Sequence, residues 1–112
     1  MGPSKRSVSV TSSSGNVFAD LGIPGAAEKQ TKVRLAFAIN RIFQSRKLSQ
    51  VAAARRLNVN QPKISALVNY QLEGFSLERL MNFLTALDRD VDIVIRRKAQ
   101  SRRVGRIAVR AV

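Results

Sequence analysis

The sequence of 112 residues predicts an all-α domain that carries one β-strand near its C-terminus. Between residues 26 and 87, apolar side chains recur at helical spacing in four separate segments. Two of these segments are short, and only a three-residue turn separates them. After residue 90 the spacing changes to the alternation that is typical of a strand. The length allows one small domain and no second well-packed one.

The composition points to a polyanionic partner and away from catalysis. The chain has 20 Lys and Arg residues against 7 Asp and Glu residues, which gives a formal net charge of +13. Such a surplus favours nucleic acid as the partner, with an anionic membrane surface as the second choice. The lack of Cys and His excludes disulfides, thiolate metal sites and imidazole catalysis. We therefore expect no enzyme activity, and no metal or other cofactor.

No segment of the sequence has the pattern of a membrane span or a signal peptide. The longest uninterrupted apolar stretch is about five residues, at 35–39, whereas a membrane helix needs about 20. The first residues carry few basic side chains and lack the apolar run of a signal peptide. We therefore expect a soluble cytoplasmic protein that has no membrane partner.

Three regions of the chain differ in composition. Residues 1–15 contain six serines and are expected to form a flexible lead. Residues 16–96 are expected to form the domain, which opens with a short turn that Gly22 ends. Residues 97–112 are expected to be a mobile basic tail, because seven basic and no acidic residues lie at 96–112. The tail is either a solubilising extension or an arm that binds phosphate, and both interpretations stay open.

The first long helix is predicted over residues 26–46. Its core-facing stripe has the i, i+4, i+7, i+8 spacing of one helix face. The residues of that stripe are Leu35, Ile39, Ile42 and Phe43. Val33 and Phe37 are expected to widen the stripe, and Asn40 is expected to lie mostly outside it.

Three shorter helices are predicted from their caps and their apolar faces. The second helix, at residues 49–57, has Ser49 as its N-cap and an alanine-rich centre. The third, at residues 60–69, has Asn60 as its N-cap and Pro62 in the first turn, where a missing N–H costs nothing. The fourth helix has Ser76 as its N-cap, and its apolar face is a stripe of leucines. The stripe consists of Leu77, Leu80, Leu84 and Leu87, with Met81 and Phe83 beside it.

A single strand is predicted over residues 90–96. Val91, Ile93 and Ile95 alternate with polar residues, although Val94 interrupts the polar face. A lone strand leaves backbone N–H and C=O groups unpaired, so it needs a partner. The simplest partner is the same strand of a second copy across a two-fold axis, which makes the protein a homodimer. The alternative is pairing with residues 8–11 of the same chain.

The second and third predicted helices have the spacing of a helix-turn-helix, with residues 58–60 as the turn. Small or apolar residues occupy the six positions at which two such helices must pack together. These residues are Ala53, Ala54, Leu57, Val59, Ile64 and Leu67. A helical hairpin within some other bundle is the alternative. Two unrelated amphipathic helices, however, rarely have small or apolar residues at all six positions and a turn in the right place.

Residues 32–87 resemble the lambda-repressor-like, or XRE, family. The resemblance rests on Leu48-Ser49-Gln50, Ala53-Ala54-Arg55-Arg56-Leu57 and Val59-Asn60-Gln61-Pro62-Lys63-Ile64-Ser65. It implies a lambda-repressor-like helix-turn-helix bundle whose third predicted helix enters the major groove of DNA. Asn58 stands where the family usually has Gly, and because Asn tolerates the left-handed conformation, the turn is expected to survive.

The same resemblance implies roles for individual residues. Gln61 is expected to read a base edge, since its amide can pair bidentately with adenine. Lys63, Ser65 and Ala66 are expected to point the same way, toward the bases. The residues expected at the DNA phosphates are Gln50, Asn60 and Asn69, with Arg46 and Lys47 as a basic rim that steers association.

A closer resemblance, over residues 16–96, is to HigA-type antitoxins. It rests on the order of a short Phe18-Ala19-Asp20-Leu21-Gly22 element, a long helix, the Gln61-Pro62-Lys63-Ile64-Ser65 helix, Phe75-Ser76-Leu77-Glu78-Arg79-Leu80 and Asp90-Val91-Asp92-Ile93-Val94-Ile95. It implies a homodimer that represses its own pseudo-palindromic operator on double-stranded DNA and sequesters a small ribonuclease toxin. A stand-alone regulator without a toxin remains an alternative, as does a non-specific nucleic-acid compactor that the tail drives.

Overall fold

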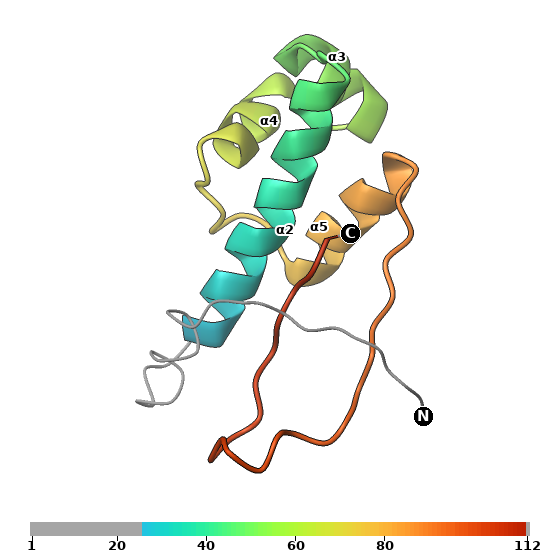
Figure 1. Cartoon of the computed structure of the whole chain (residues 1–112). Helices are drawn as coiled ribbons and strands as arrows, with labels where there is room; N and C mark the ends of the chain where they lie inside the picture. Colours follow the sequence, from blue (N-terminus) through green and yellow to red (C-terminus); the bar gives the residue numbers. More distant parts are fainter. Residues whose placement is uncertain (1–25, 112) are drawn as a thin grey trace. The chain divides into compact units, whose positions relative to one another are not determined.

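Four α-helices follow one another in the computed structural model, which describes residues 26–111. They are α2 (Ala26–Ser45), α3 (Gln50–Leu57), α4 (Gln61–Val68) and α5 (Leu77–Ala86) (Figure 1). All four predicted helices are confirmed, with bounds that differ from the expected ones by a residue or so at each end. The flexible lead, the short turn before Gly22 and the alternative strand at 8–11 lie outside the described residues.

The core-facing stripe of α2 is confirmed, but its predicted width is wrong. Leu35, Ile39, Ile42 and Phe43 are all buried. Val33 and Phe37 are 42% and 54% exposed, and Asn40 is buried. At roughly 100° per residue, Val33 and Phe37 point nearly opposite to Leu35, whereas Asn40 falls between buried neighbours. The buried arc therefore includes Ala36 and Asn40 in place of the two larger apolar residues.

The three short helices complete a core within the compact unit Lys32–Val91. Helix α3 packs against both α4 and α5. At the start of α5, the Ser76 hydroxyl accepts a hydrogen bond of 3.0 Å from the Arg79 backbone N–H. The buried face of α5 and the residue after it follow the predicted leucine stripe, with a 6.0 Å edge contact between the Phe75 and Phe83 rings. Its buried members are Leu80, Phe83, Leu84 and Leu87.

The strand predicted over residues 90–96 is not formed in the described chain. Residues 89–99 have no regular secondary structure, and no residue of the range 26–111 pairs with them in a β-ladder. The chain is extended here and then turns at residues 99–102, where the Arg102 N–H donates to the Ala99 carbonyl over 3.1 Å. A strand needs a second strand to complete its hydrogen bonds, and this stretch of the single chain offers none. None of the helices in the described range is long and apolar enough to cross a bilayer.

Candidate nucleic-acid interface

The turn between α3 and α4 is closed by side chains that the sequence places at the helix ends. The Ser49 hydroxyl accepts from the Ala52 N–H over 3.0 Å, and the Asn60 Oδ1 accepts from the Lys63 N–H over 3.1 Å. Asn58 ends α3 in the left-handed conformation, with φ 59° and ψ 46°. Asn is among the few side chains that adopt this conformation readily. The predicted turn at 58–60, with Asn58 in place of Gly, is confirmed.

The six packing positions of the helix-turn-helix lie where two such helices must meet. Ala53, Ala54, Leu57, Ile64 and Leu67 are buried, and Val59 in the turn is half-buried. Because α3 and α4 are only eight residues long, these few contacts fix the orientation of one helix against the other. They also direct the opposite face of α4 outward.

The outward face of α4 carries three of the four predicted base-reading residues. Ile64 and Leu67 point into the core, so Ser65 and Ala66 lie on the other side of the helix, and Gln61, about 60° around the helix from Ile64, lies at the edge of that side. Gln61 is exposed, and Ser65 and Ala66 are half-buried. Asn69 follows on the same side, exposed, and its side-chain amide donates to the Ser65 carbonyl over 2.9 Å. The structure therefore brings these four polar or small side chains together on one surface.

Lys63 does not share the face of Gln61 and Ser65. Its ammonium donates to the Gly74 carbonyl over 3.2 Å and lies 4.8 Å from the centre of the Phe75 ring. A cation over an aromatic face is stabilised by the electrons of the ring. The expectation that Lys63 points the same way as its neighbours is thus not met, and a base contact would require its ammonium to leave the loop.

Asn40 is a residue of this interface that the sequence interpretation placed outside the core. Its side-chain amide crosses from α2 to α4 and donates to the Leu67 carbonyl over 3.2 Å. Its Oδ1 is buried and meets no donor among the described residues. The available signal was a polar residue inside the arc that Ala36, Ile39 and Phe43 define. Asn40 thus binds the C-terminal end of α4 to the long helix.

Two of the predicted phosphate-binding residues lie together at the start of α3. Lys47 and Gln50 line a recess of about 320 Å³ between α2, α3 and α4, together with Ser49 and Tyr70. Lys47 is exposed and adopts a left-handed conformation at the end of α2. The first N–H groups of a helix have no partner within the helix and attract anions. This end of α3 therefore combines backbone donors, an amide, a hydroxyl and an ammonium.

Arg46 lies apart from that group, at the C-terminal end of α5. Its guanidinium donates to the Leu87 carbonyl over 2.7 Å and approaches Asp88 Oδ2 to 3.6 Å. Arg56 reaches the same end, with bonds to the Ala86 carbonyl and to Asp88 at 3.2 and 3.0 Å. Positive charge is favourable at a helix C-terminus, where carbonyls are unpaired. Arg46 and Arg56 thus both contact the C-terminal end of α5, whereas the sequence interpretation expected Arg46 at the phosphates.

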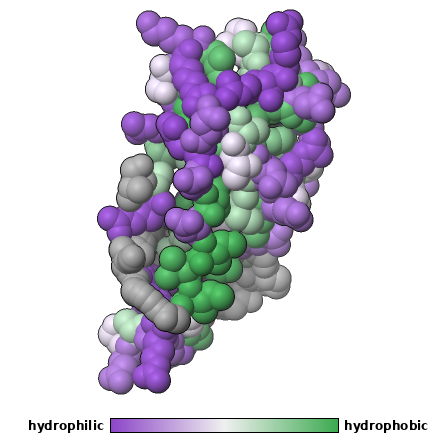
Figure 2. Space-filling model, turned by 90° about the vertical axis from the view of Figure 1, so that its right-hand side faces the viewer, coloured by the Kyte–Doolittle hydropathy of each residue, from purple (hydrophilic) through white to green (hydrophobic). Residues whose placement is uncertain are grey.

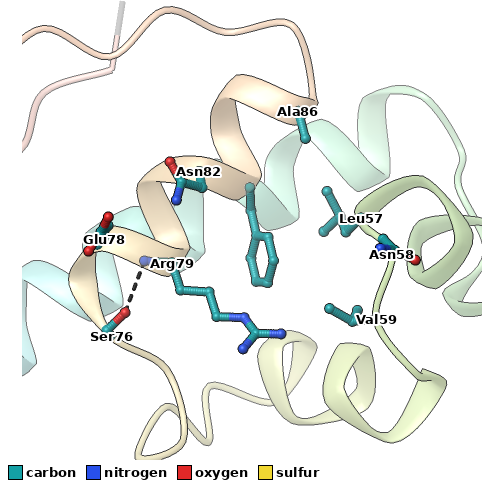
Figure 3. A pocket seen from close by; sticks show the side chains of 9 residues that line it. Leu57, Asn58, Val59, Ser76, Glu78, Arg79, Asn82 and Ala86 are labelled. Atoms are coloured by element: carbon teal, nitrogen blue, oxygen red, sulfur yellow. Dashed lines mark hydrogen bonds between the residues drawn. The ribbon is translucent and has the colours of Figure 1, made fainter.

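A groove of about 390 Å³ runs between the turn and α5 (Figure 3). Leu57, Val59 and Phe83 form apolar walls, and the Arg79 guanidinium lies 5.6 Å from the centre of the Phe83 ring. The other lining residues are Asn58, Ser76, Glu78, Asn82 and Ala86. No cluster of three or more His, Cys, Asp or Glu residues that could hold a metal ion occurs in the described part of the chain.

Comparison with known proteins agrees with this geometry. A family model described as a helix-turn-helix domain matches residues 17–96. The chain belongs to this helix-turn-helix family. A solved structure named as a candidate transcriptional regulator of the XRE family is 61% identical in sequence and has a TM-score of 0.76. The similarity covers 80% of this chain and 100% of that chain.

None of the curated proteins matches the chain. The helix-turn-helix match includes α2 to α5 and the extended residues up to 96. The basic tail at residues 97–112 lies beyond the matched range, so the family says nothing of its role.

Proposed function

We propose that this helix-turn-helix protein is a sequence-specific DNA-binding transcriptional repressor that binds a pseudo-palindromic operator as a homodimer. The observation that carries the proposal is the outward side of α4, where Gln61 is exposed and Ser65 and Ala66 are half-buried, outside the arc of the buried Ile64 and Leu67. The name of the 61% identical structure, an XRE-family transcriptional regulator, supports the same reading.

The chemistry of the α4 face fits the edges of bases in a major groove. The groove is wide enough to admit an α-helix. A Gln amide carries an NH₂ donor group and a carbonyl acceptor, so its oxygen can accept from N6 of adenine while its NH₂ donates to N7. An Ala methyl can contact the methyl group of thymine. Gln61 stands in the first turn of α4, where a recognition helix makes its base contacts. Gln61 is therefore proposed as the principal base reader, with Ser65 and Ala66 beside it.

Phosphate contacts are proposed on both sides of that helix. The start of α3 offers Gln50 and Lys47, and the end of α4 offers Asn69. The Asn60 Oδ1 accepts the capping bond from the Lys63 N–H, and the NH₂ group of Asn60 supplies the donor that a phosphate needs. Contacts of this kind fix the position of the protein on DNA, while base contacts decide the sequence.

The homodimer is proposed because one eight-residue helix reads only a short site. In helix-turn-helix dimers, two half-sites lie about one turn of DNA apart, roughly 34 Å from centre to centre. Val91, Ile93 and Ile95 are the proposed contacts between copies, since Ile93 and Ile95 are 73% and 83% exposed in the single chain. Repression then follows from occupancy of promoter DNA.

Replacing Gln61 by Ala tests the proposed function. Gln61→Ala is expected to relax the preference at one base pair of each half-site, because a good bidentate contact contributes about 1–3 kcal/mol of discrimination. The measurement is selection of bound oligonucleotides from a random pool, followed by titration of the selected site and its single-base variants.

Gln71→Ala is the matched control, since Gln71 is an exposed amide outside α4. It should leave the base preference unchanged. An unchanged preference in Gln61→Ala would contradict the assigned role. Failure of the unaltered protein to select any sequence would favour the non-specific compactor over the repressor.

An antitoxin role is proposed as the biological setting, on the order of elements over residues 16–96. Its partner would be a small ribonuclease encoded beside this gene. Co-expression tests the idea: the neighbouring product should arrest growth alone and lose that effect when this protein is present. A neighbouring gene of another kind, with operator binding intact, would leave a stand-alone regulator.

A further inference from the structure

The extended segment at residues 90–98 has a charge pattern that is reversed about its centre. Asp90 and Asp92 lie before the centre, and Arg96 and Lys98 lie after it at the same distances. Val94 stands at the centre. All four charged positions share the parity of Val94, so in an extended chain they lie on the same face as Val94.

The middle of the segment exposes apolar side chains that nothing in the described chain covers. Ile93, Val94 and Ile95 are 73%, 54% and 83% exposed. Figure 2 shows hydrophobic surface gathered into a patch on the face turned to the viewer, between hydrophilic regions. Contiguous exposed apolar surface marks an interaction site in many soluble proteins. The backbone of residues 91–99 also forms no ladder within the described range.

We propose that residues 90–98 of two copies pair as an antiparallel ribbon whose two-fold axis passes beside Val94. In this register Val94 faces Val94 of the second copy. Asp92 faces Arg96 of the second copy, and Asp90 faces its Lys98. By symmetry each pair occurs twice, so the ribbon contains four cross-strand pairs of opposite charge on one face. Residues that face each other directly in antiparallel strands have Cβ atoms about 4.5–5.5 Å apart, within reach of an ion pair.

The other face of the same ribbon is apolar except for Arg97. Ile93 faces Ile95 of the second copy, and Ile95 faces its Ile93, which covers the two most exposed of the large apolar side chains in the segment. Val91 faces Arg97 of the second copy, whose aliphatic stem can lie along an apolar surface. Cross-strand pairs of β-branched residues stabilise antiparallel sheets. One register therefore satisfies the charges on one face and the isoleucines on the other.

Other registers lose part of this complementarity. With the axis beside Ile93, Asp90 still faces Arg96, but Asp92 faces the apolar Val94. With the axis beside Ile95, only the pairing of Asp92 with Lys98 remains. A parallel arrangement in register places like charges opposite each other, which destabilises a sheet. The Lys98 ammonium bonds to the Arg102 carbonyl over 2.7 Å in the single chain, and an ammonium has two further donors.

The register rests on the homodimer of the proposed function and adds how the two copies align. A two-stranded ribbon without further support is marginally stable in water. Association through it is therefore expected to depend on protein concentration, and to weaken as salt screens the exposed ion pairs.

Cysteine cross-linking of the full-length protein tests the register directly, because the chain contains no Cys. Three variants are compared under mild oxidation: Ile93→Cys, Val94→Cys and Ile95→Cys. Only Val94→Cys places a thiol opposite its own copy, since the other two face each other and lie about 7–8 Å or more from their own copies. A disulfide needs Cβ atoms about 3.5–4.5 Å apart. Val94→Cys should form a covalent dimer at least about tenfold faster than either neighbour.

Charge reversal provides a second readout by analytical ultracentrifugation. Asp92→Arg should raise the dimer dissociation constant at least about tenfold, and the double variant Asp92→Arg with Arg96→Asp should restore it. Glu73→Arg is the matched control, because it makes the same change in net charge at an exposed site outside the ribbon. It should leave the dissociation constant close to that of the unaltered protein.

The outcomes separate the register from the dimer and from DNA binding. Faster cross-linking at 93 or 95 would overturn the register while the homodimer stands. If the protein is a dimer that none of the variants cross-links and that charge reversal does not weaken, the interface does not lie at residues 90–98. A monomer at all concentrations would overturn both the register and the dimeric part of the proposed function. The base preference of Gln61 is measured separately and survives any of these results.

Discussion

The α3–α4 pair and the extended segment at residues 90–98 differ in how their backbone hydrogen bonds are made. In α3 and α4 each hydrogen bond closes over four residues, and the cap residues Ser49 and Asn60 satisfy donors at the helix starts. In the extended segment the backbone forms no ladder with any of residues 26–111, and the apolar side chains at its centre are more than half exposed. Helices complete their hydrogen bonds locally, whereas a strand requires a partner from elsewhere. The structure of the α3–α4 pair therefore follows from its own sequence, whereas that of the extended segment depends on whether a second strand pairs with it.

The largest expected difference between the two regions is in unfolding free energy. Leu67→Ala should lower the free energy of unfolding by about 2–5 kcal/mol, because it leaves a cavity at a fully buried site between α3 and α4. Ile95→Ala should change it by less than about 0.5 kcal/mol in the monomer, because Ile95 is 83% exposed. Urea denaturation followed by circular dichroism, at a concentration that keeps the chain monomeric, measures both. Equal losses would show that the extended segment belongs to the folded core.

The N-cap of α4 tests whether local hydrogen bonds stabilise the α3–α4 pair. Asn60→Ala should cost about 0.5–2 kcal/mol of unfolding free energy, since it removes the bond to the Lys63 N–H. Asn69→Ala, at the other end of the same helix, removes only an exposed side-chain bond and should cost about 0.5 kcal/mol or less. Thermal and urea unfolding of the two variants provide the measurement. A larger loss in Asn69→Ala would reverse the assignment of the cap.

The smallest effect is expected at Asp88, which stands between α5 and the extended segment. Asp88→Asn removes the charge that pairs with Arg46 and Arg56, but the Asp88 side chain is 71% exposed. Exposed ion pairs contribute about 0–1 kcal/mol, and salt reduces that contribution. Urea denaturation at low and at high salt should show a small loss that shrinks as salt is added. A loss that is as large as that of Leu67→Ala and insensitive to salt would contradict a surface pair.

The sequence was sufficient where a residue acts on its near neighbours. Ser49, Asn58, Asn60 and Ser76 cap or end helices as predicted, because capping involves residues within one turn. The six packing positions of the helix-turn-helix were also predicted, since fixed spacing sets which side of each short helix is buried. The outward placement of Gln61, Ser65 and Ala66 follows from the same spacing.

The sequence was insufficient where a side chain reaches a distant element. Arg46 bonds to the Leu87 carbonyl, 41 positions later, and Asn40 bonds to Leu67, 27 positions later. Lys63 turns toward the loop at Gly74 and Phe75, although the family resemblance implied that it points the same way as Gln61. Long flexible side chains choose among several partners, and only the folded chain decides which carbonyl or ring is within reach. The width of the α2 stripe failed for a simpler reason, since hydrophobicity was given more weight than the angle around the helix.

Asn40 gives the core a directional contact that its apolar neighbours cannot provide. Apolar packing depends on area and volume, so a short helix can rotate or slide slightly at small cost. A hydrogen bond from the side chain to the Leu67 carbonyl tolerates much less displacement. Its buried Oδ1, without a donor in the described chain, carries a desolvation penalty that an aliphatic residue would avoid. Asn40 therefore constrains the rotational setting of α4, and with it the direction in which the exposed Gln61 side chain points.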